Sequence, residues 1–547
     1  MSNSMDDVAE KAAAFFVIGS NTTEQHPVFG SHLRQAVLRR GAKLVVADPR
    51  RIDLADLATT AHGGLYLRHR PGTDIVLLNC LMNIIINNGW EDKNFIAART
   101  EGYDEFVATI EQYPPEKASE ITGVPIEQLF QAAEILALNK PMAVIWAMGI
   151  TQHIVGVRNV MSLANLQMVL GNMGIEGGGV NPLRGQNNVQ GACDMGGLPN
   201  VYTGYQTVTS EEVRLKFEAA WGVSLPEKVG LTTTEMIPAC ENGVVRALYI
   251  LGEDPVMSDP NTRHIRRCLE RCEFLILQEI FPSETSAYAD VILPGVSFAE
   301  KTGTFTSTER RIQMVRKAIE PLGEARPDWQ ITSEIAHRII ALGGRRIQHA
   351  AHSEWNYNNT SEIMAEISAV TPSYAGISHA RLETGERLQW PVKGPDHPGT
   401  PILHIGQFTR GKGKFAPIDH IPPAESPDDE YPILLSTGRV LYHWHGGQMT
   451  RRAEGLLEAY DRALVEVNPD DARNWGVHVG MRLCVTSRRG SIVAEAWITE
   501  RVPPGMVYAN FHFPEASANE LTHASLDPVA KIPEYKISAV RVEVAQV

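Results

Sequence analysis

Near its start the chain alternates short apolar runs with a polar turn and a segment of helical periodicity, and this pattern constrains the fold most strongly. Residues 15–19 (FFVIG) form the first apolar run, and residues 43–47 (KLVVA) form the second. Between them, residues 26–40 repeat apolar side chains at the helical period, and Gly41 supplies a stop signal. A strand, a helix and a second strand in this order predict a parallel sheet of the α/β class.

The same plan returns later in the chain, which indicates more than one domain. Residues 247–251 (ALYIL) and 274–278 (FLILQ) are again apolar runs separated by a helical segment. A chain of 547 residues is too long for one core. We expect an α/β architecture with two facing Rossmann-like parallel-sheet domains, followed by a β-rich C-terminal part. The expected boundaries are residues 1–184, 185–400, a linker at 401–430, and the β-rich part at 431–547.

Shorter patterns refine this plan. Residues 75–90 and 126–138 have the spacing of amphipathic helices, and residues 142–146 (MAVIW) form a further buried strand. Near the C-terminus, two strand-like runs flank residues 487–490 (SRRG), which predicts a β-hairpin.

Charge and composition exclude several classes of function. The formal net charge is −14, which opposes a general role on nucleic acid or on a membrane surface. No apolar run approaches the roughly 20 residues that span a bilayer, so we expect no membrane insertion. The six cysteines form no CxxC pair and no zinc or iron–sulfur spacing, and are interpreted as inert free thiols. Scattered cysteines fit a reducing compartment, and the cytoplasm is the expected location.

The most unusual stretch is residues 171–200, in which nine glycines lie among arginine, amide and acidic side chains. Glycine allows a backbone to approach a ligand closely, and clustered amides can donate and accept hydrogen bonds at once. One interpretation is a long surface loop. The preferred interpretation is a wall of a polar ligand site, with Arg184 directed into it. In either case we expect so polar a segment to stay out of a core.

This stretch carries a resemblance to a known family. The segment GGVNPLRGQNNVQGACDMG resembles the signature of formate dehydrogenase catalytic subunits, which are molybdopterin oxidoreductases. The similarity extends from VIGSNTTE near the start to DPVAKIPEYK near the end. It implies oxidation of formate to CO2 at a bis(molybdopterin guanine dinucleotide) cofactor carrying molybdenum or tungsten. It also implies that residues 431–547 form a C-terminal β-barrel of the double-psi type, which binds this cofactor.

The resemblance further implies which residues hold the cofactor. One arm is expected to contact Asn21, Glu24, Asp48, Arg50, Gly72, Asp74, Met148, Gln152 and Asn188. The other arm is expected to contact Asp254, Gln278, Asp328, Arg439, His443, Asn519, Tyr535 and Lys536, and Gln186 is a further expected contact. Several of these follow predicted strands, where parallel sheets bind ligands. We therefore expect Asn21, Asp48, Gln152, Asn188, Asp254 and Lys536 to converge on one site.

Arg184 is the expected substrate contact. Formate is a small planar carboxylate, and a guanidinium matches it through two parallel hydrogen bonds. His443 and His445 could instead bind a metal from one face of a strand, but a third ligand is missing from the pattern. We favour a cofactor contact for His443 and expect no metal ligand in this chain.

Two parts of the family pattern are not matched. The family has a [4Fe–4S] domain and a cysteine or selenocysteine that ligates the metal, and both are expected upstream of Met1, which is interpreted as an internal methionine. The resemblance also implies an iron–sulfur or diaphorase subunit as electron-transfer partner. Two alternatives stay open: a different molybdopterin oxidoreductase, or a non-catalytic pterin-binding chain without the redox centre.

Overall fold

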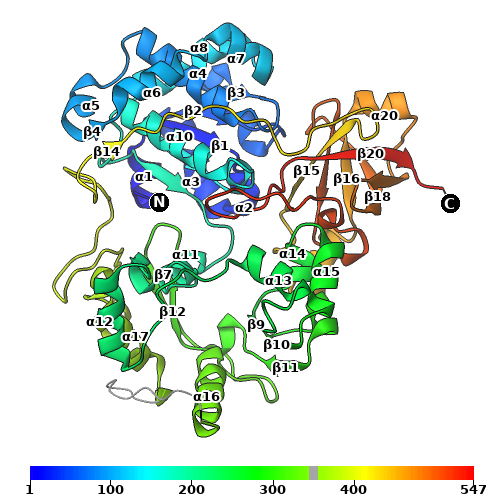
Figure 1. Ribbon diagram of the computed structural model, residues 1–547. Coiled ribbons are helices and arrows are strands. Elements are labelled where there is room, and N and C mark those ends of the chain that lie inside the picture. Colours follow the sequence, from blue (N-terminus) through cyan, green and yellow to red (C-terminus); the bar gives the residue numbers. More distant parts are fainter. Residues whose placement is uncertain (344–354, 547) are drawn as a thin grey trace. The chain divides into compact units, whose positions relative to one another are not determined.

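The computed structural model describes residues 1–343 and 355–546, which form two compact units (Figure 1). The first unit comprises Met1–Gly185, Pro255–Arg266 and Ile402–Val547. The second unit comprises Gln186–Asp254 and Arg267–Pro401. Within the described residues, no helix has the length and apolar character needed to cross a bilayer.

The first unit begins with a five-stranded sheet in the order β3-β2-β1-β5-β6, and all neighbouring strands are parallel. Its strands are β1 (Ala14–Ile18), β2 (Lys43–Ala47), β3 (Leu65–Leu67), β5 (Met142–Trp146) and β6 (Val180–Pro182). This confirms the predicted parallel sheet. The sequence patterns did not predict β6, because it is short and lies in the glycine-rich stretch.

Helices cover both faces of this sheet. Side chains of β1 alternate between two hydrophobic cores: Phe16 belongs to the core with α4 (Asp74–Asn87), and Phe15 to the core with α3 (Pro27–Arg40). The other helices of this part are α1 (Met5–Lys11), α2 (Thr22–Gln25), α5 (Lys93–Arg99), α6 (Tyr103–Ile110), α7 (Pro115–Thr122), α8 (Ile126–Leu138), α9 (Met148–Thr151) and α10 (Gly156–Val169). A sheet buried on both faces explains the continuous apolar runs of its strands.

The prediction that α4 is amphipathic was wrong. Residues from Asp74 to Ile85 are all buried. The helix packs against α8, α10 and α7 at once, so it has no solvent-facing stripe.

The C-terminal part of the first unit is a closed six-stranded barrel in the order β15-β19-β16-β18-β17-β20. Its strands are β15 (Ile433–Gly438), β16 (Leu464–Val467), β17 (Arg482–Thr486), β18 (Ser491–Ile498), β19 (Met506–Asn510) and β20 (Ser538–Val544), with α19 (Glu454–Ala459) and α20 (Pro469–Trp475) in its connections. The barrel and the predicted hairpin of β17 and β18 are confirmed.

The second unit contains a parallel three-stranded sheet in the order β11-β10-β9. Its strands are β9 (Ala247–Leu251), β10 (Phe274–Glu279) and β11 (Val291–Pro294), and an antiparallel pair is formed by β12 (Gly303–Thr306) and β13 (Ile312–Val315). Further helices are α11 (Val189–Asp194), α12 (Glu211–Trp221), α13 (Thr233–Glu241), α16 (Asp328–Ala341), α17 (Thr360–Val370) and α18 (His379–Glu383). The two helices α14 (Pro255–Ser258) and α15 (Thr262–Glu270) follow β9 in the chain.

Candidate functional site

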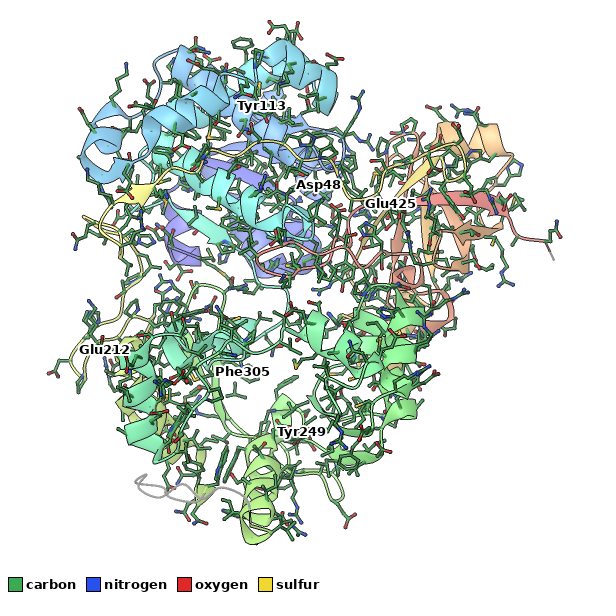
Figure 2. The ribbon with its side chains drawn as sticks, viewed as in Figure 1. Asp48, Tyr113, Glu212, Tyr249, Phe305 and Glu425 are labelled. Atoms are coloured by element: carbon green, nitrogen blue, oxygen red, sulfur yellow. The ribbon has the colours of Figure 1, made fainter. Side chains whose placement is uncertain are left out.

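The carboxyl edge of the five-stranded sheet gathers several of the predicted residues. Asn21 follows β1, Asp48 follows β2, Met148 and Gln152 follow β5, and Arg184 follows β6. The chain proceeds from β1 outward to β2 and β3, and then returns to place β5 on the other side of β1. In such sheets ligands bind where the strand order reverses, which is here between β1 and β5. Asp48 is labelled in Figure 2.

Two glycines bring the loops after β1 and β5 into backbone contact at this reversal. The Gly149 N–H donates to the carbonyl oxygen of Gly19 over 2.9 Å. A Cβ atom on Gly149 would lie 2.5 Å from that oxygen, and one on Gly19 would lie 2.5 Å from the nitrogen of Ile150. Any side chain at Gly149 would therefore push the two loops apart. Sequence patterns did not single out this pair, because the two glycines are distant in the chain.

Positive charge concentrates beside this edge. Burial and the charge of Arg439 together lower the pKa of Lys536 to about 8, while the charge of Asp48 opposes the shift. Burial likewise lowers the pKa of Arg439. Burial and the charge of Arg439 lower the pKa of His445 to about 4. Partly buried cationic side chains that lie near one another favour an anionic ligand.

Arg439 lies against Gly185, the residue that follows Arg184. A Cβ atom on Gly185 would be 2.5 Å from Nη1 of Arg439, so a side chain there would displace this guanidinium. The carbonyl oxygen of Arg184 accepts a hydrogen bond from Nε2 of His26 over 2.6 Å. The backbone on both sides of Arg184 is thus held by the first unit itself.

Arg50, an expected cofactor contact, also has a partner within the protein. Its guanidinium donates to both carboxylate oxygens of Glu466 on β16 and lies 4.2 Å from the ring centre of Tyr508. Burial alone would lower the pKa of Arg50, but the hydrogen bond and charge of Glu466 raise it above its ordinary value. Arg50 therefore joins the loop after β2 to the barrel.

Other predicted residues of the first unit also have protein partners. Asp74 lies 3.1 Å from Nε2 of His69, and Glu24 lies 3.4 Å from Arg501. Burial would raise the pKa of Asp74, but the charge and hydrogen bond of His69 lower it below its ordinary value. Gly72 has a φ of +77°, and a Cβ there would collide with Pro423.

His443 does not have the arrangement of a metal ligand. Its Nδ1 lies 3.2 Å from the hydroxyl of Thr450, and its Nε2 lies 2.6 Å from the carbonyl oxygen of Tyr460. Both ring nitrogens therefore bond within the barrel part of the chain. The expected contact of His443 with the cofactor stays a prediction.

Asn519 and Tyr535 hold the backbone of α14. The amide of Asn519 donates to Met257 O over 2.7 Å, and the Tyr535 hydroxyl donates to Ser258 O over 2.8 Å. No described residue donates to the buried Oδ1 of Asn519. A buried acceptor without a donor is costly, so this oxygen is suited to an N–H of a ligand or a bound water.

In the second unit, a polar cluster follows β10. The Gln278 amide donates to Asp328 over 2.8 Å, and Lys301 lies 2.5 Å from the other oxygen of Asp328. The hydroxyl of Tyr249, which Figure 2 labels, donates to Gln278. The cluster orients both the amide and the carboxylate that were predicted to contact the cofactor.

The remaining predicted residues of this unit mostly bond to its own backbone. Asp254 accepts hydrogen bonds from the N–H of Thr285 over 3.0 Å and from its hydroxyl over 2.6 Å. Asn188 accepts from the N–H of Thr306 over 3.0 Å. Gln186 is half-buried at the start of the unit. Because Asn188 and Asp254 belong to the second unit, their convergence with Asn21, Asp48, Gln152 and Lys536 stays a prediction.

The expectation that residues 171–200 avoid a core was wrong. Asn181, Gln190 and Asp194 are buried. Each is hydrogen-bonded: Asn181 donates to Gly178 O over 3.1 Å, and Asp194 accepts from Gln190 over 2.8 Å and from Tyr374 over 2.6 Å. These hydrogen bonds offset the free-energy cost of removing the polar side chains from water.

The cysteines agree with their interpretation as inert thiols. All six are free, and Cys80, Cys240 and Cys268 are buried. Burial raises the pKa of Cys80 to about 12, which suppresses the reactive thiolate.

Comparisons with known proteins agree with this geometry. Residues 1–338 match the family model described as "Molybdopterin oxidoreductase", and residues 433–539 match "Molydopterin dinucleotide binding domain". The F420-dependent formate dehydrogenase subunit alpha of Methanocaldococcus jannaschii is 44% identical over 99% of this chain and 78% of its own length. Formate dehydrogenase H of Escherichia coli is 38% identical over 99% of this chain and 74% of its own length.

A solved structure has the same fold. Acetylene hydratase from Pelobacter acetylenicus superposes with a TM-score of 0.75 at 19% sequence identity. The match covers 99% of this chain and 80% of that protein.

Proposed function

The chain belongs to the molybdopterin oxidoreductase family, and we propose that it is the catalytic part of a formate dehydrogenase that oxidises formate to CO2. The observation that carries this proposal is the position of Arg184 directly after β6, with Arg439 against the next residue, Gly185, at the edge where parallel sheets generally bind ligands. The relatives named above support formate as the substrate.

The residues at the sheet edge fit an anionic dinucleotide cofactor. The cationic side chains of Lys536 and Arg439 lie near each other, and Asn519, beside α14, offers a buried acceptor. A pyrophosphate would supply the missing negative charge, and a guanine or pterin N–H would supply a donor. When bound, bis(molybdopterin guanine dinucleotide) supplies a molybdenum or tungsten centre that accepts two electrons.

Within this proposal, Lys536 and Arg439 hold phosphate oxygens of the cofactor, and Asn21 and Gln152 contact one of its arms from the loops after β1 and β5. Gln278 and Asp328 contact the other arm with the amide and carboxylate that Lys301 and Tyr249 orient. The backbone hydrogen bond between Gly19 and Gly149 holds the loops after β1 and β5 close together.

Arg184 binds and orients the substrate. Its guanidinium pairs with the formate carboxylate through two parallel N–H donors, which fixes the direction of the C–H bond. The neighbouring charge of Arg439 adds to the attraction for a small anion. His26 anchors the Arg184 carbonyl, so the arginine backbone keeps its position while substrate exchanges.

The electrons must leave through another group, and we propose an iron–sulfur or diaphorase-type subunit as partner. Two relatives are named as alpha subunits of formate dehydrogenases, which supports a multisubunit enzyme. Six free thiols support a reducing compartment such as the cytoplasm.

The decisive experiment is to purify the full-length enzyme with its cofactor and measure its metal content, its guanine nucleotide content and its formate-dependent dye reduction. Formate oxidation with about one metal per chain is expected if the family's bis-dinucleotide cofactor binds. Dye reduction by another substrate from a panel, with none by formate, would favour a different oxidoreductase. Bound pterin without metal or any dye reduction would favour the non-catalytic chain.

A further inference from the structure

We propose that Glu534 is a positioning residue that holds the loop after β5 and the C-terminal segment of Lys536 in register with each other. Both segments carry residues assigned to the cofactor above, so the identity of the ligand rests on the proposed function. The positional role itself rests on contacts inside the first unit.

The carboxylate of Glu534 is the meeting point of three chain segments. It is 1% exposed, and it accepts hydrogen bonds from the N–H of Ile154 over 3.3 Å and from the N–H of Ala424 over 2.9 Å. Nδ1 of His153 lies 3.7 Å from it, and Nε2 of His523 lies 3.5 Å from it. The two N–H groups and the two histidine rings belong to the loop after β5, the linker, and the segment that follows the barrel strand β19.

The contacts continue to the reversal point of the sheet. Nε2 of His153 lies 3.0 Å from the carbonyl oxygen of Gly149, whose N–H donates to Gly19. Gln152 precedes His153 directly, and Lys536 lies two residues after Glu534. A shift of this carboxylate would therefore move Gln152 and Lys536, which approach the same sheet edge from different parts of the chain.

The hydrogen bonds to its ionised form explain how the Glu534 carboxylate is accommodated at so buried a position. Burial would raise the pKa of Glu534, but the nearby His153 ring and the two backbone N–H groups lower it below its ordinary value. An ionised carboxylate accepts stronger hydrogen bonds than a neutral group of the same shape. Removing it would leave two backbone donors unsatisfied in a buried position.

Asp527 provides a matched control in the same C-terminal segment. It is equally buried, and it accepts hydrogen bonds from Val157 at the start of α10 and from the N–H groups of Val529 and Ala530. It thus ties the segment to α10, three residues beyond Ile154, and lies nine residues before Lys536 in the chain. Loss of Asp527 should loosen the fold without uncoupling those two segments.

The test compares Glu534→Leu, Glu534→Gln and Asp527→Asn in the full-length enzyme. Hydrogen exchange followed by mass spectrometry reports peptides that cover residues 147–155 and 533–538. A second measurement follows the rate at which the guanine nucleotide of the cofactor leaves the protein after dilution. Thermal unfolding of each variant separates local from global effects.

For Glu534→Leu we expect about tenfold faster exchange in both peptides and about tenfold faster nucleotide release, because two buried hydrogen bonds to a charged group are lost. Glu534→Gln should recover part of both effects, since its carbonyl oxygen still accepts one N–H. Asp527→Asn should lower the unfolding temperature and speed exchange near residue 157, with nucleotide release unchanged.

Unchanged exchange at residues 147–155 in Glu534→Leu would overturn the positional role. Equal nucleotide release from the Glu534→Leu and Asp527→Asn variants would overturn it as well, because a general loss of stability would then suffice. Absence of guanine nucleotide from the unmutated enzyme would instead overturn the proposed function, and the exchange data would still test the role of Glu534.

Discussion

Arg50 and Glu466 form a buried, two-pronged ion pair between the loop after β2 and the barrel strand β16. Nε of Arg50 donates to Oε2 over 2.8 Å, and Nη2 donates to Oε1 over 2.5 Å. The side chains are 8% and 4% exposed. Asp48 lies two residues before Arg50, so this pair fixes the barrel to the loop that carries a predicted cofactor contact.

Glu466→Gln should therefore destabilise the first unit by about 3–5 kcal/mol, because it leaves the Arg50 charge buried without its partner. Chemical denaturation followed by intrinsic fluorescence measures this change. Glu515→Gln is the matched control, since its pair with Arg451 is largely exposed, and exposed pairs contribute little. Equal effects of the two substitutions would contradict the assigned role of Arg50.

Gly149→Ala should separate the loops after β1 and β5. The new Cβ would lie 2.5 Å from the Gly19 oxygen, and overpacking of this kind costs about 1–3 kcal/mol. We expect a lower unfolding temperature and a lower content of guanine nucleotide in the purified enzyme.

Gly455→Ala is the control for this change, because no atom lies within 4 Å of a Cβ at Gly455. It should leave both the unfolding temperature and the nucleotide content near the unmutated values. A Gly149→Ala enzyme that keeps its full nucleotide content would show that the contact of the two loops does not shape the cofactor site.

Arg184→Lys should keep the positive charge but lose the two-pronged donor. We expect kcat/KM for formate to fall by an amount equivalent to about 2–4 kcal/mol of transition-state stabilisation. Steady-state dye reduction by the complete enzyme measures the effect. Arg462→Lys, at an exposed position of the barrel, should leave kcat/KM unchanged, and an unchanged value for Arg184→Lys would move the substrate contact elsewhere.

The lowered pKa of Lys536 predicts that anion binding depends on pH. Its pKa falls from 10.5 to about 8 because burial and Arg439 disfavour the charged form. The unfolded chain therefore binds more protons between pH 8 and 10.5, so folding stability should rise with pH across this window. An anion needs the charged lysine, so its affinity should fall by up to about tenfold per pH unit above pH 8.

Calorimetric binding of guanosine diphosphate to the cofactor-free protein from pH 7 to pH 10 measures this dependence. Lys536→Met should weaken binding at pH 7 and flatten the pH profile. A profile for Lys536→Met that still falls above pH 8 would assign the titration to another group.

Local patterns were enough to locate many elements. The strands at Lys43–Ala47, Met142–Trp146 and Ala247–Leu251 have the predicted bounds, because each is a short run of apolar residues between polar turns. The hairpin of β17 and β18 follows from its glycine-containing turn. The placement of Asn21 and Asp48 after strands also follows from the sequence, since parallel strands present their carboxyl ends at one edge.

Partners could not be predicted in the same way. Arg50 is followed in sequence by residues typical of a ligand-binding loop, but 416 positions separate it from Glu466. The full burial of α4 and the hydrogen-bonded burial of Asp194 likewise depend on which elements pack around them. The periodicity of apolar residues within one element carries no information about which other elements pack against it.

The sequence by itself determined the α/β class, the order of the strands along the chain, and the residue types suited to a large anionic cofactor. These properties depend on local periodicity and on the chemistry of single side chains. Only the tertiary structure decided that Gly19 meets Gly149, that Arg439 lies against Gly185, and that Glu534 joins three segments. Contacts of this kind depend on the packing of elements that are remote in the chain, and their energies exist only once the chain has folded.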